Sequence, residues 1–564
     1  MHLSLLRLIL QALMFKALWK KLFHKESTSI RSAALLLAGA TLVSRFVGIV
    51  RDRLLSGAFG AGAELDAYYA AFRTPDFIYN LFVLGAITAG FIPVFAAVFV
   101  KGRETEDGVG EDGSTLASAL MTVLGVTLVT LSAIGIFAAP FLVALLTPGF
   151  SASQRELTVS LTRVMFFSPV FLGLSSVLGG ILQTKRRFFI YALAPVMYNV
   201  GIITGIVFLA PTLGIRGVAY GVVLGAFAHF LVQAFACRAI GFRYRFFWKP
   251  QHEGVVTIAK HSVPRIASLA VSQVNLFILT GLASTLGAGG IAVFNLANNL
   301  QNFPVGILGV SFAVAAFPII SDLAAREKKD ELVAQFSRTV RTVLFLIIPA
   351  TVAFLLLRAQ IIRVILGTGR FDWSDTISTA QTLAFFTLSL FAQALYPLVV
   401  RVFFALQDMK TPLLTAVFAV IVERLLAWQF LRHGMGTPGL ALAFSLGSIL
   451  DLALLWCFLR HRIGDLGERR IFRALAQMSG AGFLMAVVIQ IMKSVLSSVV
   501  NMQTGVGIFT QGFVAGIAGI ATYLAAAYVI GSEEAKEVMV LYAKKVSGVR
   551  QMNVVQEEET LNVE

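Results

Sequence analysis

Charged side chains inside apolar segments are the residues of this sequence whose types point to chemistry. Two hydrophobic stretches near the start of the chain hold Arg45, Arg51, Asp52, Asp66 and Arg73. A charge at the bilayer centre costs roughly 2.5–3.5 kcal/mol on insertion scales, so such residues are functional candidates. Arginine suits phosphate because its planar guanidinium can bind two oxygens at once. Three arginines against two aspartates predict a net positive wall for an anionic, phosphate-bearing ligand.

The spacing of these residues places them on shared helix faces. Arg45 and Asp52 are two helical turns apart, as are Asp66 and Arg73, so each pair lies on one face of its helix. Pro75 then interrupts the second helix and frees backbone groups, which neighbouring helices or cavity water must satisfy. We therefore expect a broken helix beside the arginines.

A structural role explains some of these charged residues as well as substrate binding does, and others less well. Arg51 and Asp66 lie near helix ends, where snorkelling or a structural ion pair explains a charge as well as function does. Arg45 and Arg73 lie deeper, and there the functional interpretation is favoured. We predict that Arg45, Arg51, Asp66 and Arg73 bind substrate.

The second half of the chain offers amides and carboxylates in place of arginines. Its amides cluster before Pro304, at Asn295, Asn298, Asn299, Gln301 and Asn302. Amides suit sugar hydroxyls, which makes Asn298 and Asn299 candidate substrate-binding residues, although hydrogen bonds between packed helices explain them equally well.

Two carboxylates, Glu423 and Asp451, fall within later apolar spans and are candidates for coupling to H⁺ or Na⁺. Glu423 precedes Arg424, and a plain ion pair is the favoured interpretation there.

Enzyme motifs are missing from the sequence. It contains no Walker A pattern, no HExxH and no GxSxG, and its seven histidines form no cluster with carboxylates. We expect no catalytic residues, no metal site and no cofactor, and a transport cycle driven by the membrane potential or by an H⁺ or Na⁺ gradient.

Composition predicts a polytopic all-α membrane protein. Hydrophobic residues make up 57% of the chain and charged residues only 13%, against about 25% charged in soluble domains. The net charge of +16 does not indicate nucleic-acid binding, because the basic residues sit in short clusters between apolar runs. About fourteen runs are long enough to span a bilayer. The predicted spans of the first half are Ala33–Leu55, Leu65–Val100, Thr115–Pro140, Leu157–Gln183, Tyr191–Ala210, Gly217–Cys237 and Val255–Thr285. Those of the second half are Ile291–Ile320, Val340–Leu357, Thr376–Leu406, Leu413–Phe430, Gly439–Phe458, Phe472–Val495 and Thr510–Ile530.

Basic loops predict the orientation of these spans. Alternate loops carry Lys185–Arg187, Arg238–Lys249, Arg326–Lys329, Lys410 and Arg460–Arg470, whereas the loops between them are mostly poor in basic residues. The outer loop at Arg358–Arg370 is a basic exception. The positive-inside rule therefore places both termini in the cytoplasm, in a multi-pass protein of the inner membrane.

An internal repeat organises the first twelve spans. The segment LTPGF…LQTKRRFF recurs as LGTGRF…FFALQDMK, and AFGAG recurs as TLGAG, at offsets of about 220 to 228 residues. Two six-helix copies that start from the same side form a parallel repeat. We predict a basic amphipathic extension at 1–30, an N-lobe at 31–250, a C-lobe at 251–465, two extra helices at 466–531 and a cytoplasmic tail at 532–564.

These residues resemble the MurJ/MviN family of lipid II flippases, in the multidrug/oligosaccharidyl-lipid/polysaccharide exporter superfamily. The resemblance covers nearly the whole chain after residue 30, and its motifs are SRFVGIVRDRLLSGAFGAGAELDAYYAAFRTPDF, GFIPVF, LQTKRRFFIYALAPVMYN, FPVGILGVSFAVAAFP and FFALQDMKTP. It implies two six-helix lobes around a central cavity, two C-terminal helices that form a groove for the lipid tail, and alternating access. The implied partners are lipid II or a similar polyprenyl-linked glycan, membrane lipids and, as a further class, cell-wall synthases, with no nucleic acid.

Motif by motif, Arg45 and Arg51 resemble the family's two first-helix arginines, and Asp66 its second-helix aspartate. This chain departs from the family at Tyr79 and Asn80, where an Arg-Arg pair is usual, at Leu84 in place of a glutamate, and at Asn299 in place of an arginine.

Three alternatives stay open on the sequence. A flippase for another polyprenyl-pyrophosphate-linked glycan fits a chain that has fewer arginines than the family usually has. A cation-coupled drug exporter would need acidic residues where this chain has basic ones. A membrane scaffold without transport would have no reason to bear charges in its apolar spans.

Overall fold

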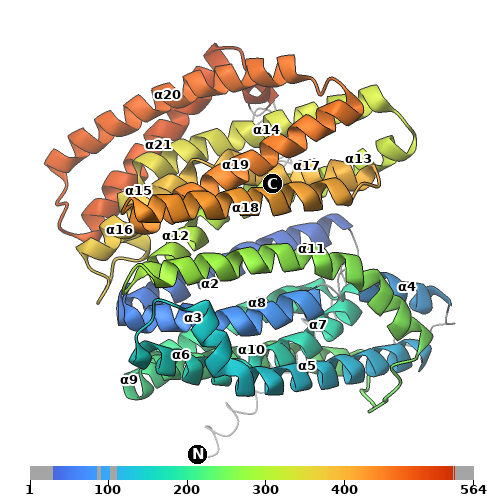
Figure 1. Cartoon of the computed structure of the whole chain (residues 1–564). Coiled ribbons are helices and arrows are strands. Elements are labelled where there is room, and N and C mark those ends of the chain that lie inside the picture. The colour runs from blue at the N-terminus through green and yellow to red at the C-terminus, as the bar shows by residue number, and fades with distance from the viewer. Residues whose placement is uncertain (1–29, 85–89, 102–110, 538, 540–564) are drawn as a thin grey trace, which may run out of the picture. The chain divides into compact units, whose positions relative to one another are not determined.

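The computed structural model describes residues 30–84, 90–101, 111–537 and 539, and within them every regular element is helical (Figure 1). The first half contains α2 (Ile30–Phe59), α3 (Ala63–Ile78), η1 (Tyr79–Leu84), α4 (Ile92–Lys101), α5 (Glu111–Leu146), α6 (Ala152–Met165), α7 (Ser168–Thr184), α8 (Phe188–Thr204), η3 (Gly205–Leu209), α9 (Ala210–Leu213), α10 (Ile215–Ala239) and α11 (Glu253–Ser284). The second half contains α12 (Gly290–Pro304), η4 (Val305–Val310), α13 (Ser311–Ala325), α14 (Lys329–Leu356), α15 (Arg358–Ile365), α16 (Trp373–Thr387), α17 (Leu390–Ala405), α18 (Lys410–Arg432), α19 (Gly436–Ile463), α20 (Glu468–Val499) and α21 (Gly505–Val529). The η elements are π-helical.

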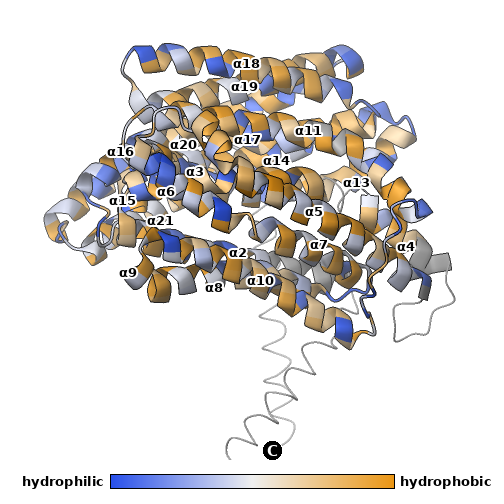
Figure 2. Cartoon of the chain, turned by 60° about the horizontal axis from the view of Figure 1, so that its bottom comes forward, coloured by the Kyte–Doolittle hydropathy of each residue, from blue (hydrophilic) through white to orange (hydrophobic). Residues whose placement is uncertain are grey.

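The predicted all-α polytopic fold is confirmed. Apart from residues 85–89, which lie outside the described part of the chain, every predicted span falls on one of these helices or on consecutive ones, and apolar residues predominate along them (Figure 2). Ten helical segments of the described residues are long and apolar enough to cross a membrane, and α16 with α17, bent by 45°, would make an eleventh. The other predicted spans fall on α2, on α3 with η1 and α4, and on α11, and α2 carries Arg45, Arg51, Asp52 and Arg53 in its second half. A total of about fourteen is consistent with this count.

Matching backbone irregularities in the two halves agree with the predicted repeat. The π-helical segments η1 and η4 begin at Tyr79 and Val305, 226 residues apart (305 − 79). Arg186 and Gln407 both adopt positive φ, at 54° and 61°, and are 221 residues apart (407 − 186). These offsets lie within the range found in the sequence. The helix break expected beside the arginines is η1, which follows Pro75 within one turn.

The contact pattern divides the chain into two compact units. The first unit comprises 1–295 and 365–375, and the second comprises 296–364 and 376–564. Each has its own apolar core, with Phe91 and Leu128 in the first unit and Phe336 and Leu455 in the second. The predicted lobes at 31–250 and 251–465 follow the repeat rather than contacts, and they stay a prediction.

The C-terminal helices belong to the second unit, where α20 packs against α21 and α14. Arg341 of α14 donates to Glu533 and Glu534, which follow α21, at 2.6 Å each. The role of 466–531 as a lipid-tail groove stays a prediction. The predicted extension at 1–30 and most of the tail at 532–564 lie outside the described residues.

Glycines bring α8 and η3, which continues it, into backbone contact with α10 in the first unit. A Cβ atom added to Gly205 would lie 2.7 Å from Cα of Gly221, and the neighbouring pair Gly201 and Gly225 is at least as close. Small residues allow membrane helices to approach this closely. The contact fixes the position of α8, which carries a polar residue of the site described next.

Candidate functional site

Arg51 of α2 is held by two oxygens from different helices. Its Nε and Nη2 donate to Oδ1 of Asp52 at 2.9 and 2.7 Å, and its Nη1 donates to Oδ1 of Asn199 in α8 at 2.9 Å. Asn199 donates in turn to the Pro195 carbonyl oxygen at 3.1 Å. The ion pair that the sequence offered as an alternative to a binding role is therefore present, and Asn199 is a site residue that the sequence did not identify.

Arg73 of α3 connects that helix to α11 and α12. Its Nε donates to Oγ1 of Thr280 at 3.0 Å, and its Nη2 donates to Oδ1 of Asn295 at 2.5 Å. Both acceptors are buried. They are neutral, so neither of them compensates the positive charge of the Arg73 guanidinium. Nη1 of Arg73 donates to none of the residues that the structure describes, which leaves it a donor for a ligand oxygen.

Asp76 changes the predicted charge balance. It lies one turn beyond Arg73 in α3 and interacts electrostatically with that guanidinium. The predicted count left out both Asp76 and Arg53. With them, three aspartates stand against four arginines in this part of α2 and α3, and the net positive wall stays a prediction.

Tyr69 interacts electrostatically with both arginine sites. Its hydroxyl is buried and has no hydrogen-bond partner among the described residues. Arg51, Asp52 and Arg73 all act on it electrostatically. A buried polar atom without a partner costs roughly 1–3 kcal/mol, so this position suits water or a ligand oxygen. We define the arginine cluster as Arg51, Asp52, Tyr69, Arg73, Asp76 and Asn199.

Asp66 serves as a cap for the start of α12. Its side chain is fully buried, and its two oxygens accept the backbone N–H of Gly289 at 2.6 Å and of Ala292 at 2.7 Å. A carboxylate at a helix N-terminus satisfies free N–H groups and meets the positive end of the helix dipole. Both oxygens are thus engaged with backbone, and a substrate-binding role for Asp66 stays a prediction.

Arg45 is partly buried in α2, and its substrate-binding role stays a prediction. Tyr79 and Asn80 are partly buried in η1, while the Leu84 side chain lies outside what the structure describes.

In the second unit, Asn298 begins a chain of neutral polar side chains. Its Oδ1 accepts from Nε2 of Gln301 at 2.9 Å. Oε1 of Gln301 accepts from Gln393 of α17 at 2.9 Å, and Gln393 also donates to Oγ of Ser389 at 2.8 Å. The hydrogen-bonded packing that the sequence left open is present at Asn298. Asn299 is exposed, and the substrate-binding role of both residues stays a prediction.

The two coupling candidates differ in their surroundings. Glu423 of α18 is buried and pairs with Arg424 at 2.6 Å, as the plain interpretation expected. Asp451 of α19 is also buried and interacts with Thr415 of α18. Its Oδ1 has no hydrogen-bond partner in the described part of the chain, and the coupling roles of Glu423 and Asp451 stay predictions.

The arginine cluster holds two guanidiniums, a group that suits anionic oxygens. Each has a carboxylate nearby, Asp52 beside Arg51 and Asp76 beside Arg73. Within the described residues, no group of three or more His, Cys, Asp or Glu side chains could hold a metal ion.

Solved structures show what this fold is similar to. A lipid II flippase MurJ in an inward closed conformation aligns with a TM-score of 0.73 at 24% identity, over 88% of this chain and 98% of that one. A multidrug resistance MATE family transporter of the MOP superfamily, in an inward-facing conformation, aligns with a TM-score of 0.63 at 18% identity, over 77% and 99%. At these identities the likeness shows the fold.

Sequence relatives show the family. The lipid II flippase MurJ of Burkholderia cenocepacia is 31% identical over 428 residues, which are 74% of this chain and 81% of that protein. A probable lipid II flippase MurJ of Bdellovibrio bacteriovorus is 27% identical over 520 residues, or 90% and 96%. The family model described as lipid II flippase MurJ matches residues 55–515, and the chain therefore belongs to the lipid II flippase MurJ family.

Proposed function

We propose that this chain translocates lipid II, the lipid-linked peptidoglycan precursor, from the inner to the outer leaflet of the cytoplasmic membrane by alternating access. The observation that carries the proposal is Arg73, a membrane-embedded guanidinium whose hydrogen-bond acceptors are neutral and whose Nη1 donates to no described residue. A pyrophosphate supplies the anionic oxygens that such a group binds. Membership of the family supports the same substrate.

The charge balance of the arginine cluster supports a second candidate substrate. The cluster holds two aspartates, Asp52 and Asp76, for its two arginines. It therefore has no excess of positive charge that would select a strongly acidic headgroup. A flippase for another polyprenyl-pyrophosphate-linked glycan fits this balance as well as lipid II does, because both keep the pyrophosphate and differ in the sugar and peptide. A cation-coupled drug exporter is less suited, since Arg51 and Arg73 would oppose a cationic drug.

Asp451 is the residue that couples transport to the ion gradient in the proposed cycle. Its buried, unpartnered oxygen supports reversible protonation or ion binding, whereas Glu423 is already neutralised by Arg424. The membrane potential or an H⁺ or Na⁺ gradient then drives the cycle, without a cofactor and without enzymatic chemistry. Asp451→Asn is expected to abolish the dependence of transport on the gradient, with Glu423→Gln as the comparison.

The orientation in the proposal follows from the basic loops, with both termini in the cytoplasm of an inner-membrane protein. Cell-wall synthases that consume the exported precursor are the proposed protein partners. A C-terminal reporter that is active only in the cytoplasm is expected to be active when fused after residue 564.

Complementation tests the function. A strain depleted of its lipid II flippase is supplied with the wild-type chain, Arg73→Ala, Arg45→Ala or Arg326→Ala. Arg326 is a matched control because it is 64% exposed and forms only a surface pair with Asp322, worth about 0–1 kcal/mol. Rescue by the wild type and Arg326→Ala, with loss of rescue in Arg73→Ala at equal membrane levels, is the expected result. Failure of the wild type would point to another glycan, and rescue by every variant would remove the arginines from the mechanism.

A further inference from the structure

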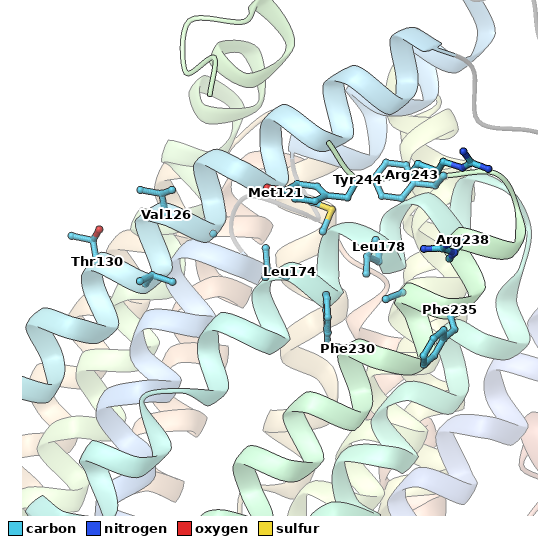
Figure 3. Close-up of a pocket in the computed structure, with 14 residues that line it drawn as sticks. Met121, Val126, Thr130, Leu174, Leu178, Phe230, Phe235, Arg238, Arg243 and Tyr244 are labelled. Atoms are coloured by element: carbon cyan, nitrogen blue, oxygen red, sulfur yellow. The ribbon is translucent and has the colours of Figure 1, made fainter. Parts of the chain in front are cut away.

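A cavity of about 790 Å³ lies in the first unit, away from the arginine cluster. Its walls come from α5, α7 and α10 and from the extended segment after α10 (Figure 3). Most of the lining is apolar and includes Met121, Leu174, Leu178 and Phe230. Ligand pockets typically measure about 300–1,000 Å³, so this cavity is large enough for a substantial part of a ligand.

The cavity opens sideways from the helices. Val126 and Val129 of α5 are 40% and 54% exposed, and Phe235 of α10 is 58% exposed. Both helices are apolar enough to cross a membrane. Val126 and Val129 lie in the middle of α5, where exposed apolar side chains face hydrocarbon, and Phe235 lies about one turn before the end of α10. Lipid can therefore reach the cavity from the bilayer.

Two arginines stand at one end of the cavity. Arg238 lies in the last turn of α10 and Arg243 in the segment that follows, and Figure 3 shows both at the end away from Thr130. Neither guanidinium has an ion pair or hydrogen bond to any residue in the described part of the chain. Two positive charges at the end of an apolar groove are complementary to an anionic head on an apolar tail.

The segment that carries Arg243 is anchored to α5. The hydroxyls of Thr122 and Tyr244 lie 3.0 Å apart, Oγ1 of Thr122 accepts from the backbone N–H of Phe247 at 3.2 Å, and Oγ of Ser118 accepts from that of Arg245 at 3.3 Å. This end of the cavity is therefore built by specific hydrogen bonds rather than by a loose loop.

Exposed aromatic residues on the same segment place it at the membrane surface. Phe246 and Trp248 are 71% and 53% exposed, next to Arg243, Arg245 and Lys249. Aromatic rings and basic side chains gather where hydrocarbon meets the headgroups. The basic run predicts the cytoplasmic side, where the leaflet surface is anionic.

We propose that this cavity binds an anionic glycerophospholipid of the inner leaflet. Its phosphate lies between Arg238 and Arg243, and one acyl chain follows the groove along α5 from Met121 toward Thr130, a rise of about 13 Å at 1.5 Å per residue. The site is separate from the arginine cluster, and it does not depend on which substrate the chain transports.

Binding is measured by native mass spectrometry on the full chain in neutral detergent, with dioleoyl phosphatidylglycerol as the probe. Dioleoyl phosphatidylcholine serves as the zwitterionic comparison. The key variant is Arg238→Gln with Arg243→Gln. Each arginine near an anionic lipid contributes about 1 kcal/mol, so the double variant should bind about 30-fold more weakly at 1.4 kcal/mol per factor of ten.

Arg245→Gln is the matched control. It removes the same charge from the same segment, but Arg245 does not line the cavity, and its backbone bond to Ser118 is unaffected. We expect close to wild-type binding for this variant. An equal loss in Arg245→Gln and the double variant, or equal binding of the two lipids by the wild type, would reduce the effect to general surface charge and overturn the site.

The apolar part of the proposal has its own test. Glycerol phosphate carries the same anionic group without acyl chains, and it should not raise the unfolding temperature at concentrations where dioleoyl phosphatidylglycerol does. Equal stabilisation by both compounds would show a phosphate site without a lipid groove, and would contradict the proposal even if every variant folds.

Discussion

Nη2 of Arg73 lies 2.5 Å from Oδ1 of Asn295, a residue 222 positions further along the chain. The arginine belongs to the broken helix of the first repeat, and the asparagine to the corresponding broken helix of the second. A charged donor in the first copy is thus held by a neutral acceptor from the second. This contact lies within the first unit, at the point where α12 begins.

A double-mutant cycle should show coupling between these two residues. Arg73→Gln and Asn295→Ala are expected to have a coupling free energy of unfolding of roughly 1.5–3 kcal/mol, typical of hydrogen bonds to charged groups. Equilibrium unfolding of the purified variants measures it. Asn298→Ala is the control, because Asn298 bonds Gln301 instead, and its effect should add to that of Arg73→Gln.

Replacing Asp66 with asparagine should destabilise the chain. The amide offers one oxygen to the N–H groups of Gly289 and Ala292 and turns its own N–H₂ toward the other donor. The expected loss is about 1–3 kcal/mol in the free energy of unfolding, seen as a lower unfolding temperature. Glu64→Gln in the first turn of the same helix is the control, since Glu64 is 49% exposed and 4.0 Å from Arg370. A similar loss in both variants would contradict the capping role.

Gly221→Ala tests the backbone contact between α10 and the start of η3, which continues α8. The new Cβ would lie 2.7 Å from Cα of Gly205, so the helices must separate, and overpacking of this kind costs about 1–3 kcal/mol. Gly48→Ala in α2 is the matched change, because a Cβ there meets nothing within 4 Å. We expect Gly48→Ala to be neutral or stabilising in thermal unfolding, and Gly221→Ala to be clearly destabilising.

The contact of Arg341 with the segment after α21 should make stability depend on acid pH. The hydrogen bond from Arg341, followed by its charge, lowers the pKa of Glu533 below its ordinary value near 4.5. A carboxyl with a lowered pKa stabilises the fold above its unfolded-state pKa and loses that contribution as the pH falls. The unfolding temperature of the wild type should therefore drop between about pH 5 and pH 3.

In Arg341→Gln the unfolding temperature should start lower at neutral pH and change less over the same acid range. Arg338→Gln removes a more exposed pair with Glu537, and should leave the pH profile close to that of the wild type. Identical profiles for the wild type and Arg341→Gln would rule out the linkage.

The spans were predictable because about twenty consecutive apolar residues mark a membrane helix. The repeat stays a prediction, with which the positive φ angles of Arg186 and Gln407 agree although the residues differ. The membrane-embedded charges Arg51, Asp66 and Arg73 could be found in the same way, since any charge in an apolar run is conspicuous.

The partners of those charges were not predictable. Asn199 and Thr280 are single neutral residues in apolar helices. They matter only because helix packing places Asn199 beside Arg51 and Thr280 beside Arg73, which lie 148 and 207 positions earlier in the sequence. Asp76 is different, because it follows Arg73 by three residues and helical spacing alone could have identified it. The backbone acceptor role of Asp66 also needed the fold, since its two donors are N–H groups that no sequence pattern marks.

The paired π-helical segments at Tyr79–Leu84 and Val305–Val310 have a consequence for the history of the chain. The same break at equivalent places in both halves is most simply inherited from one ancestral unit that preceded the duplication. The side chains beside the two breaks differ in charge, because Arg73 precedes the first and neutral asparagines precede the second. One backbone break is therefore compatible with different side-chain chemistry in each half.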